Sequence, residues 1–406
     1  MSLLKFEFRK FVIKPYVLIL IIVCTAVDMV GVYFSCDEYK NWYDQDNFQK
    51  VYNSKLAGEL TEDKIDYVIA EDERLTNIIQ VGTFSQEYDP ATITGYIFGD
   101  WVLFHDNIKP KMEYAVGYAY DINRIVGNAT ENLAFFEEQK APYELKKNQQ
   151  ILSLYSNRSI HEFYDLMGMK YYLHYDFSSL LVLLLCILII VPVFVGEKET
   201  KMDQLLPAYK NGRKKLVRTK IIFTYTIVLF LSLWFLIWDL IGFALFSPFR
   251  GFGAPLYAVQ VFGYTPLNLK IWQYILLSFL LRTLGMSSLA GLILLASKIF
   301  SKTMYAFTIS TGAILIPFMS QFVAKDQFTF LELTNPALLI KNRYLFMEYT
   351  AQKFFGNPIS AAIPAVIANI VWISIGVVLV LQLSTDSKSL RIDFSKARRW
   401  TFFLLN

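Results

Sequence analysis

The sequence places three ionisable side chains, Asp28, Asp239 and Arg282, inside stretches that are otherwise apolar enough to cross a membrane. A charge near the bilayer centre costs about 2.5–3.5 kcal/mol on insertion scales, so each of these groups needs a partner or access to water. The two acids stand near the ends of their stretches, where they either reach water or contribute to a polar patch on a substrate path. Arg282 stands near the middle of its stretch, and we expect it to have a buried partner, either Asp239 or Asp28.

A second group of charged residues lies in a polar run, residues 196–220, between two strongly apolar stretches. The run opens with the acids Glu197 and Glu199, among residues that are good helix formers. Three apolar side chains then recur on one helical face: Met202, Leu205 and Leu206. This spacing predicts a short amphipathic helix. Such a helix is either a surface anchor or the part that fits a groove on a partner protein.

The second half of the same run is basic. Gly212, preceded by an asparagine, supplies a tight reversal. Five bases then lead into the next apolar stretch: Arg213, Lys214, Lys215, Arg218 and Lys220. Basic side chains at such a position are expected among phospholipid head groups, so the whole run is predicted to be a loop held at one membrane face.

Residue types that carry catalysis or bind metals are few. The three histidines, His105, His161 and His174, have no ligand-like spacing, and no cysteine stands near them. The sequence contains neither a G-x-S-x-G nucleophile motif nor a G-x-x-x-x-G-K-[ST] phosphate loop. We therefore expect this chain not to be an enzyme and to hold no metal. Any nucleotide energy would be supplied by another polypeptide.

The elements that position these residues follow from composition. The chain is 54% hydrophobic and only 18% charged, as is typical of membrane proteins. Because a helix of about 20 residues spans the hydrocarbon core, six stretches are long enough to cross. They are residues 15–34, 177–195, 221–249, 271–297, 303–323 and 359–383. The predicted fold class is mainly α, a polytopic membrane protein with six transmembrane helices.

The distribution of charge predicts sidedness. Lysines and arginines of the short connecting segments concentrate on the side of both termini, which places the termini in the cytoplasm of a cell-membrane protein and residues 37–176 outside. That block is acidic, whereas the rest of the chain is basic. A basic remainder dominated by apolar spans favours contact with an anionic lipid bilayer and argues against nucleic acid as a partner.

The long acidic block is predicted to be a mostly helical extracellular domain, residues 36–176, inserted between the first and second spans. Thr61, followed by two acids, indicates a helix start. Further helices are expected through residues 116–126, stopping near Gly127, and from residue 151 towards 164. Residues 92–104 are rich in β-branched and aromatic side chains and could form a strand.

The block divides the predicted organisation into three parts. Residues 1–35 form an amphipathic N-terminal helix and the first span, residues 36–176 the domain, and residues 177–406 the other five spans. The last part includes the cytoplasmic loop 196–220 and an extracellular segment, residues 324–358.

These features together resemble the type-2 permease subunits of ATP-binding cassette (ABC) exporters. The resemblance is carried by the acid pair Glu197 and Glu199 after the second span, the Met-x-x-Leu-Leu pattern from Met202, and the Gly-Arg pair at Gly212 before a basic start to the third span. It extends to the N-terminal amphipathic helix, the six spans, the outer domain and the re-entrant-looking segment before the last span. The start of span two, Tyr-Asp-Phe-Ser-Ser-Leu from Tyr175, is similar to that of large-loop members from Gram-positive Firmicutes.

The resemblance implies a function that the residues alone do not. In that family the loop after span two carries a coupling helix that contacts the ATPase. The positions that match it are Glu197, Glu199, Met202, Leu205, Leu206, Gly212 and Arg213. The chain would then be the permease of an ATP-driven exporter for an amphipathic peptide, a lipid or a drug.

Its expected partners are an ABC ATPase subunit, which would hold ATP and magnesium, and a second permease in a homodimer or heterodimer. No cofactor is expected in this chain. The alternative from another class is a non-transporting membrane sensor, in which the outer domain binds a ligand and the loop signals inward.

Overall fold

The computed structural model describes residues 3–41, 45–82, 88–202, 212–320 and 329–385. Within these ranges the chain is mainly α-helical, and six helical segments are long and apolar enough to cross a membrane. They are Pro15–Asp37, Met167–Glu199, Lys214–Phe246, Ile271–Ile299, Thr303–Ser320 and Ala362–Ser384. The prediction of a mainly α-helical chain with six helices suited to crossing a membrane is confirmed.

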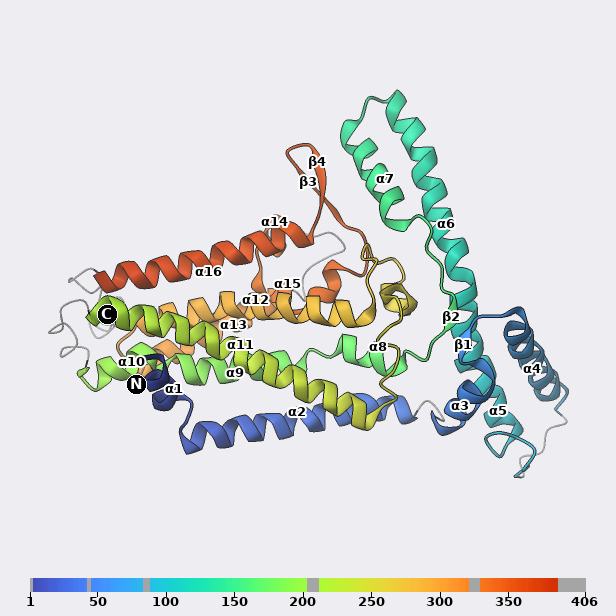
Figure 1. Cartoon of the computed structure of the whole chain (residues 1–406), viewed down its shortest axis with the longest axis horizontal. Coiled ribbons are helices and arrows are strands. Elements are labelled where there is room, and N and C mark those ends of the chain that lie inside the picture. The colour runs from blue at the N-terminus through green and yellow to red at the C-terminus, as the bar shows by residue number, and fades with distance from the viewer. Residues whose placement is uncertain (1–2, 42–44, 83–87, 203–211, 321–328, 386–406) are drawn as a thin grey trace, which may run out of the picture.

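The apolar segments pack side by side as a bundle (Figure 1). Its helices are α1 (Leu3–Phe11), α2 (Pro15–Asn41), α9 (Phe177–Ile190), α10 (Pro192–Glu199), α11 (Gly212–Phe246), α12 (Ile271–Ile299), α13 (Thr303–Ser320) and α16 (Ala362–Thr385). Helix α9 is central, because most of its side chains are buried and it packs against α2, α11, α12 and α13. Pro192 begins α10 and separates it from α9, since proline is tolerated in a first helical turn but not in a helix interior.

The segment between α2 and α9 forms an inserted domain at one end of the bundle, opposite the end where α1 lies (Figure 1). Its elements are α3 (Gln45–Val51), η1 (Tyr52–Leu56), β1 (Gly58–Glu59), α4 (Glu62–Val81), α5 (Ile97–Val102), η2 (Leu103–Ile108), α6 (Lys109–Glu138), α7 (Pro142–Tyr155), β2 (Glu162–Phe163) and α8 (Met167–His174). Strands β1 and β2 pair antiparallel and join the start of the domain to its end. Phe48, Leu56, Val68, Phe104 and Ile108 are fully buried in its core.

The local predictions for this domain meet different outcomes. A helix does begin after Thr61, as α4. The expected stop near Gly127 is wrong, because α6 continues through it to Glu138. The third predicted helix ends early, since α7 runs from Pro142 only to Tyr155.

The possible strand over residues 92–104 is wrong, because that segment turns into α5 and η2. Asp100, which is buried, explains the turn. Its carboxylate accepts hydrogen bonds from the backbone N–H groups of Ile93 and Thr94, at 2.9 and 2.7 Å. Side-chain bonds of this kind give the backbone an alternative to a strand ladder, and composition alone does not reveal them.

The buried carboxylate of Asp72 connects α4 to η2 and α6. Asp72 of α4 is 2.8 Å from Nδ1 of His105 and 2.7 Å from Nζ of Lys109. Burial opposes ionisation of this carboxyl, but the hydrogen bonds from Lys109 and His105 outweigh it and lower the pKa of Asp72. A carboxylate with a lowered pKa stabilises the folded state above its unfolded pKa, and this stability is lost as the pH falls through the folded pKa.

We expect Asp72→Asn to lower the free energy of unfolding of the inserted domain by about 2 kcal/mol at neutral pH, because it removes the charge that both partners face. Thermal unfolding of the two proteins at pH 7 and pH 3 measures this. The difference should be smaller at pH 3, because Asp72 of the unfolded chain binds a proton there while the lowered pKa resists protonation of the folded carboxylate. Glu71→Gln, at an exposed ion pair on the same helix, is the control and should have little effect. An equal loss in both variants would contradict the prediction.

Short elements fill the connections at the domain end of the bundle. Between α11 and α12 lie η5 (Leu256–Ala258) and η6 (Gln260–Phe262). Between α13 and α16 lie α14 (Phe330–Leu333), α15 (Pro336–Ile340), η7 (Asn342–Leu345) and the hairpin β3 (Ala351–Phe354) and β4 (Asn357–Ser360). All five residues of α15 are buried. This helix packs closely on α12, because a Cβ atom at Gly285 would lie 2.8 Å from the carbonyl oxygen of Pro336.

Candidate functional site

Helix α10 carries three consecutive charged residues, Glu197, Lys198 and Glu199, and each contacts a different part of the bundle. Successive positions on a helix point about 100° apart, so three neighbouring side chains reach different surroundings. We call this set of contacts the α10 junction. It includes both acids that the sequence analysis assigned to contact with an ATPase.

Glu197 joins α10 to two other helices. Its Oε1 accepts a hydrogen bond from Nζ of Lys10 of α1 at 2.8 Å, and its Oε2 lies 2.5 Å from Nζ of Lys220 of α11. Lys220 is fully buried, and its ammonium also donates to the carbonyl oxygen of Val193 at 2.6 Å. The sequence predicted that Lys220 would lie among lipid head groups, and this is wrong because its side chain is buried. Three of the other bases of the same run, Lys214, Lys215 and Arg218, are exposed.

Lys198 and Glu199 bind the ends of the two following helices. The ammonium of Lys198 donates to the carbonyl oxygens of Lys298 and Phe300, at the C-terminus of α12. The carboxylate of Glu199 accepts from the backbone N–H and hydroxyl of Thr303, at 2.7 and 2.9 Å, at the N-terminus of α13. A cation at a helix C-terminus and an anion at a helix N-terminus both interact favourably with the helix dipole.

The N-terminal helix is part of the same junction. Phe8 of α1 packs edge-to-face on Phe223 of α11, with ring centroids 5.1 Å apart. Glu7 is buried, and burial raises the pKa of its carboxyl, against the opposing charges of Lys220 and Lys10. Helix α1 is therefore amphipathic as predicted, and it packs against the bundle through the side that carries Glu7 and Phe11, whereas Phe6 and Arg9 are exposed.

The remaining residues assigned to ATPase contact lie beyond the junction. Helix α10 ends at Glu199, and Lys201 has a left-handed backbone with φ of 59°, so this helix does not continue unbroken to Met202. Met202 is exposed. Gly212 and Arg213 form the first turn of α11. Leu205 and Leu206 lie outside the described residues.

A second polar cluster lies within the bundle, around Arg282 of α12. Its guanidinium is 3.4 Å from Oδ1 of Asp176 and donates to the carbonyl oxygen of Tyr175 at 3.3 Å. Asp176 also forms an ion pair with Arg343 of η7, at 2.7 Å. The expected buried partner exists, but it is Asp176 and not Asp239 or Asp28. Asp176 therefore joins the start of α9 to α12 and to the segment before α16.

Asp28 and Asp239 instead face each other between α2 and α11. Both are buried, so neither reaches water at the end of its helix. Oδ1 of Asp28 accepts from the hydroxyl of Tyr175 at 2.9 Å, and Oδ2 of Asp239 accepts from that of Ser178 at 2.8 Å. The other oxygen of each carboxyl has no donor among the described residues, and the two carboxyls are within hydrogen-bonding reach of each other. One proton held between them satisfies both oxygens.

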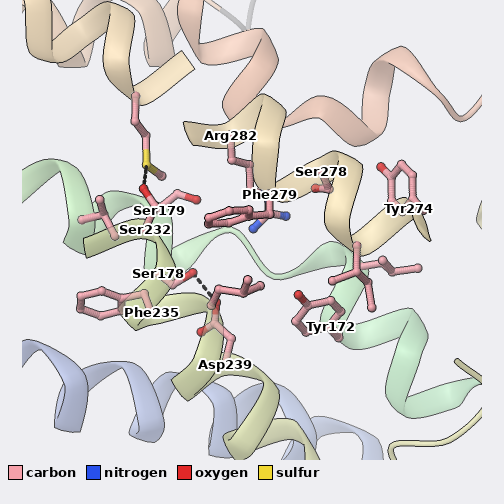
Figure 2. Close-up of a pocket in the computed structure, with 15 residues that line it drawn as sticks. Tyr172, Ser178, Ser179, Ser232, Phe235, Asp239, Tyr274, Ser278, Phe279 and Arg282 are labelled. Atoms are coloured by element: carbon pink, nitrogen blue, oxygen red, sulfur yellow. Dashed lines mark hydrogen bonds between the residues drawn. The ribbon is translucent and has the colours of Figure 1, made fainter. Parts of the chain in front are cut away.

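A small cavity of about 40 Å³ lies beside this pair (Figure 2). Asp239, Ser178 and Tyr172 line one side of it, and Arg282, Ser278 and Tyr274 line the other. A cavity of this size and polarity has room for water but not for an organic substrate. The described part of the bundle therefore contains a small polar site between α9, α11 and α12.

Several members of these clusters were not identified from the sequence. Asp176 immediately precedes an apolar stretch, where an acid is usually interpreted as a helix cap and not as an ion-pair partner. Arg343 lies in the connecting segment 324–358, far from both Asp176 and Arg282 in the sequence. Lys10 belongs to the predicted amphipathic N-terminal helix, for which no individual contact was predicted. Lys220 is the ninth residue of α11, two turns inside the helix, where an unpaired base is costly, but the span predicted from the sequence began only at residue 221.

Comparisons with protein-family models, with curated proteins and with solved structures found no match for this chain.

Proposed function

We propose that this chain is the permease subunit of an ATP-driven exporter and that it moves an amphipathic peptide, lipid or drug out of the cell. In this proposal both termini are cytoplasmic and the inserted domain is extracellular. A separate ATPase subunit binds ATP and magnesium and contacts the segment that follows α10. Two permeases, identical or similar, act together with two such ATPases.

The observation that carries the proposal is the α10 junction. The segment after α10 is attached to a helix whose three charged residues bind α1, α11, α12 and α13. A displacement of that segment by a partner would therefore move four other helices together. Transport coupled to a separate motor requires such a rigid connection between the contact surface and the spans.

The bundle also offers surfaces for lipid or for a second permease. Apolar side chains of α2, α13 and α16 are widely exposed, including Ile19, Ile316 and Ile367. Such rows suit a hydrocarbon environment or a neighbouring apolar helix. The sensor alternative needs no second permease and no ATPase, so partner composition separates the two proposals.

The test is purification of the tagged chain from its own cells in mild detergent. We expect a Walker-motif ATPase to co-purify, and the complex in nanodiscs to hydrolyse ATP faster than the ATPase alone. Leu205→Asp with Leu206→Asp should abolish this stimulation. The control is Tyr120→Asp, at an exposed site on α6 of the inserted domain, and it should leave the stimulation unchanged. If no ATPase co-purifies, or if both variants behave alike, the exporter proposal fails and the sensor alternative is favoured.

A further inference from the structure

The hairpin formed by β3 and β4 ends in a turn whose sequence does not suit its backbone. Phe354 pairs with Asn357 at the end of the ladder, so the turn itself consists of Phe355 and Gly356. Both turn residues have a positive φ, 47° and 78°. Two-residue turns of this kind favour asparagine, aspartate or glycine, because other side chains are strained in the left-handed region. Gly356 follows this preference, whereas Phe355 does not, so the turn alone does not explain the phenylalanine.

The same phenylalanine is almost completely exposed within the described part of the chain. The exposed fraction of Phe355 is 90%, and that of its neighbour Phe354 is 55%. Their rings meet edge to face, with centroids 4.6 Å apart. A single exposed apolar side chain is ordinary, but two adjacent aromatic rings at the tip of a hairpin form a small patch from which water is readily displaced. The tip is therefore suited to contact with an apolar medium.

The body of the hairpin is fixed against α7, so its tip points in a defined direction. Nζ of Lys146 donates to the side-chain oxygen of Asn357 at 2.7 Å. The side-chain amide of Gln150 donates to the carbonyl oxygen of Pro358 at 3.1 Å. The hydroxyl of Tyr349, which precedes β3, donates to the side-chain oxygen of Gln150. The hairpin and α7 therefore hold each other in place, and a contact made by the tip would act on the inserted domain.

Strand β4 leads directly into a helix suited to crossing a membrane. The strand ends at Ser360, and the apolar segment of α16 begins at Ala362. Ile363 and Ile367 of that helix are more than half exposed, as suits side chains that face lipid. The hairpin stands across the axis of α16, and its turn is level with the domain end of that helix and not beyond it (Figure 1). The tip therefore lies at the level where α16 would enter a bilayer.

This level of a bilayer favours the residues that the tip carries. Phenylalanine and other aromatic side chains are stable at the boundary between lipid head groups and hydrocarbon. The four tip residues, Phe354 to Asn357, carry no charge that would oppose entry. Lys353 is the nearest base, and its ammonium lies over the ring of Tyr143 of α7, 5.3 Å from the ring centroid. The charge is thus held on the side of the inserted domain, and the aromatic rings are left at the tip.

We propose that the tip of the β3–β4 hairpin is a membrane anchor. The rings of Phe354 and Phe355 enter the boundary between head groups and hydrocarbon, in the leaflet where α16 begins. Because the hairpin is bound to α7, the anchor also fixes this part of the inserted domain relative to the membrane surface. The partner is the lipid surface itself. The proposal rests on α16 crossing the membrane, and it does not depend on whether the chain exports anything.

The test places one trifluoromethyl-phenylalanine at position 355 of the full chain in nanodiscs. Two other exposed apolar residues are replaced in the same way in separate samples. Ile367 of α16 is the reference for lipid, and Val81 of α4, at the far end of the inserted domain, is the reference for water (Figure 1). Relaxation of the single fluorine signal is measured with dissolved oxygen, which concentrates in lipid, and with a gadolinium chelate, which stays in water.

We expect the ratio of the oxygen effect to the gadolinium effect at position 355 to equal that at position 367 and to exceed that at position 81. A ratio at 355 equal to that at 81 would place the tip in water and overturn the proposal. Weak effects of both reagents at 355 would show a ring covered by protein and would also overturn it. A ratio at 367 equal to that at 81 would show that α16 does not enter the bilayer, which removes the basis of the anchor.

A substitution separates the membrane contact from the turn. Phe355→Asn supplies a residue that the positive φ favours, so the hairpin itself should persist. With the fluorinated residue at position 354, this variant should lower the equilibrium constant for insertion of the tip about tenfold or more, since burial of one phenylalanine ring contributes at least that factor. The oxygen effect should fall and the gadolinium effect should rise. Val81→Asn is the control and should change neither. If Phe355→Asn also changes neither, the ring does not hold the tip in the membrane, and the proposal fails.

Discussion

Replacing Glu197 by alanine is expected to lower the free energy of unfolding by about 3–5 kcal/mol, because it removes the carboxylate that pairs directly with the buried ammonium of Lys220. Lys220 is fully buried, and its ammonium is 2.5 Å from the Glu197 carboxylate. The carbonyl oxygen of Val193 would remain as a hydrogen-bond acceptor and Glu7 as a nearby acid, but burial raises the pKa of Glu7 and so opposes its charge. Equilibrium unfolding in mixed micelles measures the loss.

Two further variants test whether the loss comes from the buried Glu197–Lys220 pair and not from removing any acid of α10. Glu199 is also an acid of α10, but it is exposed and only caps α13, so Glu199→Ala should cost about 1 kcal/mol. The double variant Glu197→Leu with Lys220→Leu removes both charges and should recover most of the loss, since apolar residues often replace a buried ion pair without penalty. If Glu197→Ala is no more harmful than Glu199→Ala, the α10 junction does not depend on this pair.

In the proposed exporter, the same double variant tests whether the junction couples a partner ATPase to the spans. It should fold and bind its ATPase, because the contact segment after α10 is unchanged. The connection from α10 to α1 and α11 through Glu197 would be gone, however, and ATP hydrolysis should no longer respond to the permease. A folded double variant with normal stimulation would mean that the junction is structural only.

The spans were predictable from the sequence because length and apolar composition are local properties. Even their ends agree closely in places, as at Pro15 and Ile271. The inserted domain was less predictable. The strand suggested for residues 92–104 follows from side-chain preference, and the hydrogen bonds to Asp100 that override it become visible only in three dimensions.

For the polar sites, too, the sequence did not reveal which distant residues come into contact. The sequence correctly indicated that Arg282 needs a partner, because the cost of an isolated charge is a property of its surroundings. The identity of the partner depends on which helices touch. Asp176 is 106 positions away from Arg282 in the chain, and nothing in the spacing connects them. Likewise, Glu197 and Glu199 were assigned to a partner protein, whereas the structure shows both engaged by this chain's own helices.

Replacing Asp176 by alanine should have the second large effect, because this carboxylate pairs with two arginines at once. Its oxygens are 3.4 Å from Arg282 and 2.7 Å from Arg343, and all three side chains are largely buried. Its loss would leave two cations facing each other between α12 and η7. We expect a loss of about 3 kcal/mol of unfolding free energy and faster hydrogen exchange in residues 341–347, which Arg343 ties to the start of α9.

A double-mutant cycle decides which acid is the partner of Arg282. Arg282→Leu combined with Asp176→Leu should be more stable than the sum of the two single losses predicts, by about 1–3 kcal/mol, because residues in direct contact couple. Arg282→Leu combined with Asp239→Asn should couple more weakly, since Asp239 is bound by Ser178, faces Asp28 and interacts with Arg282 only through its charge. A larger coupling with Asp239 than with Asp176 would contradict this assignment. Arg282 would then belong to the carboxyl pair between α2 and α11, and the link from α9 to the segment before α16 would rest on Arg343 alone.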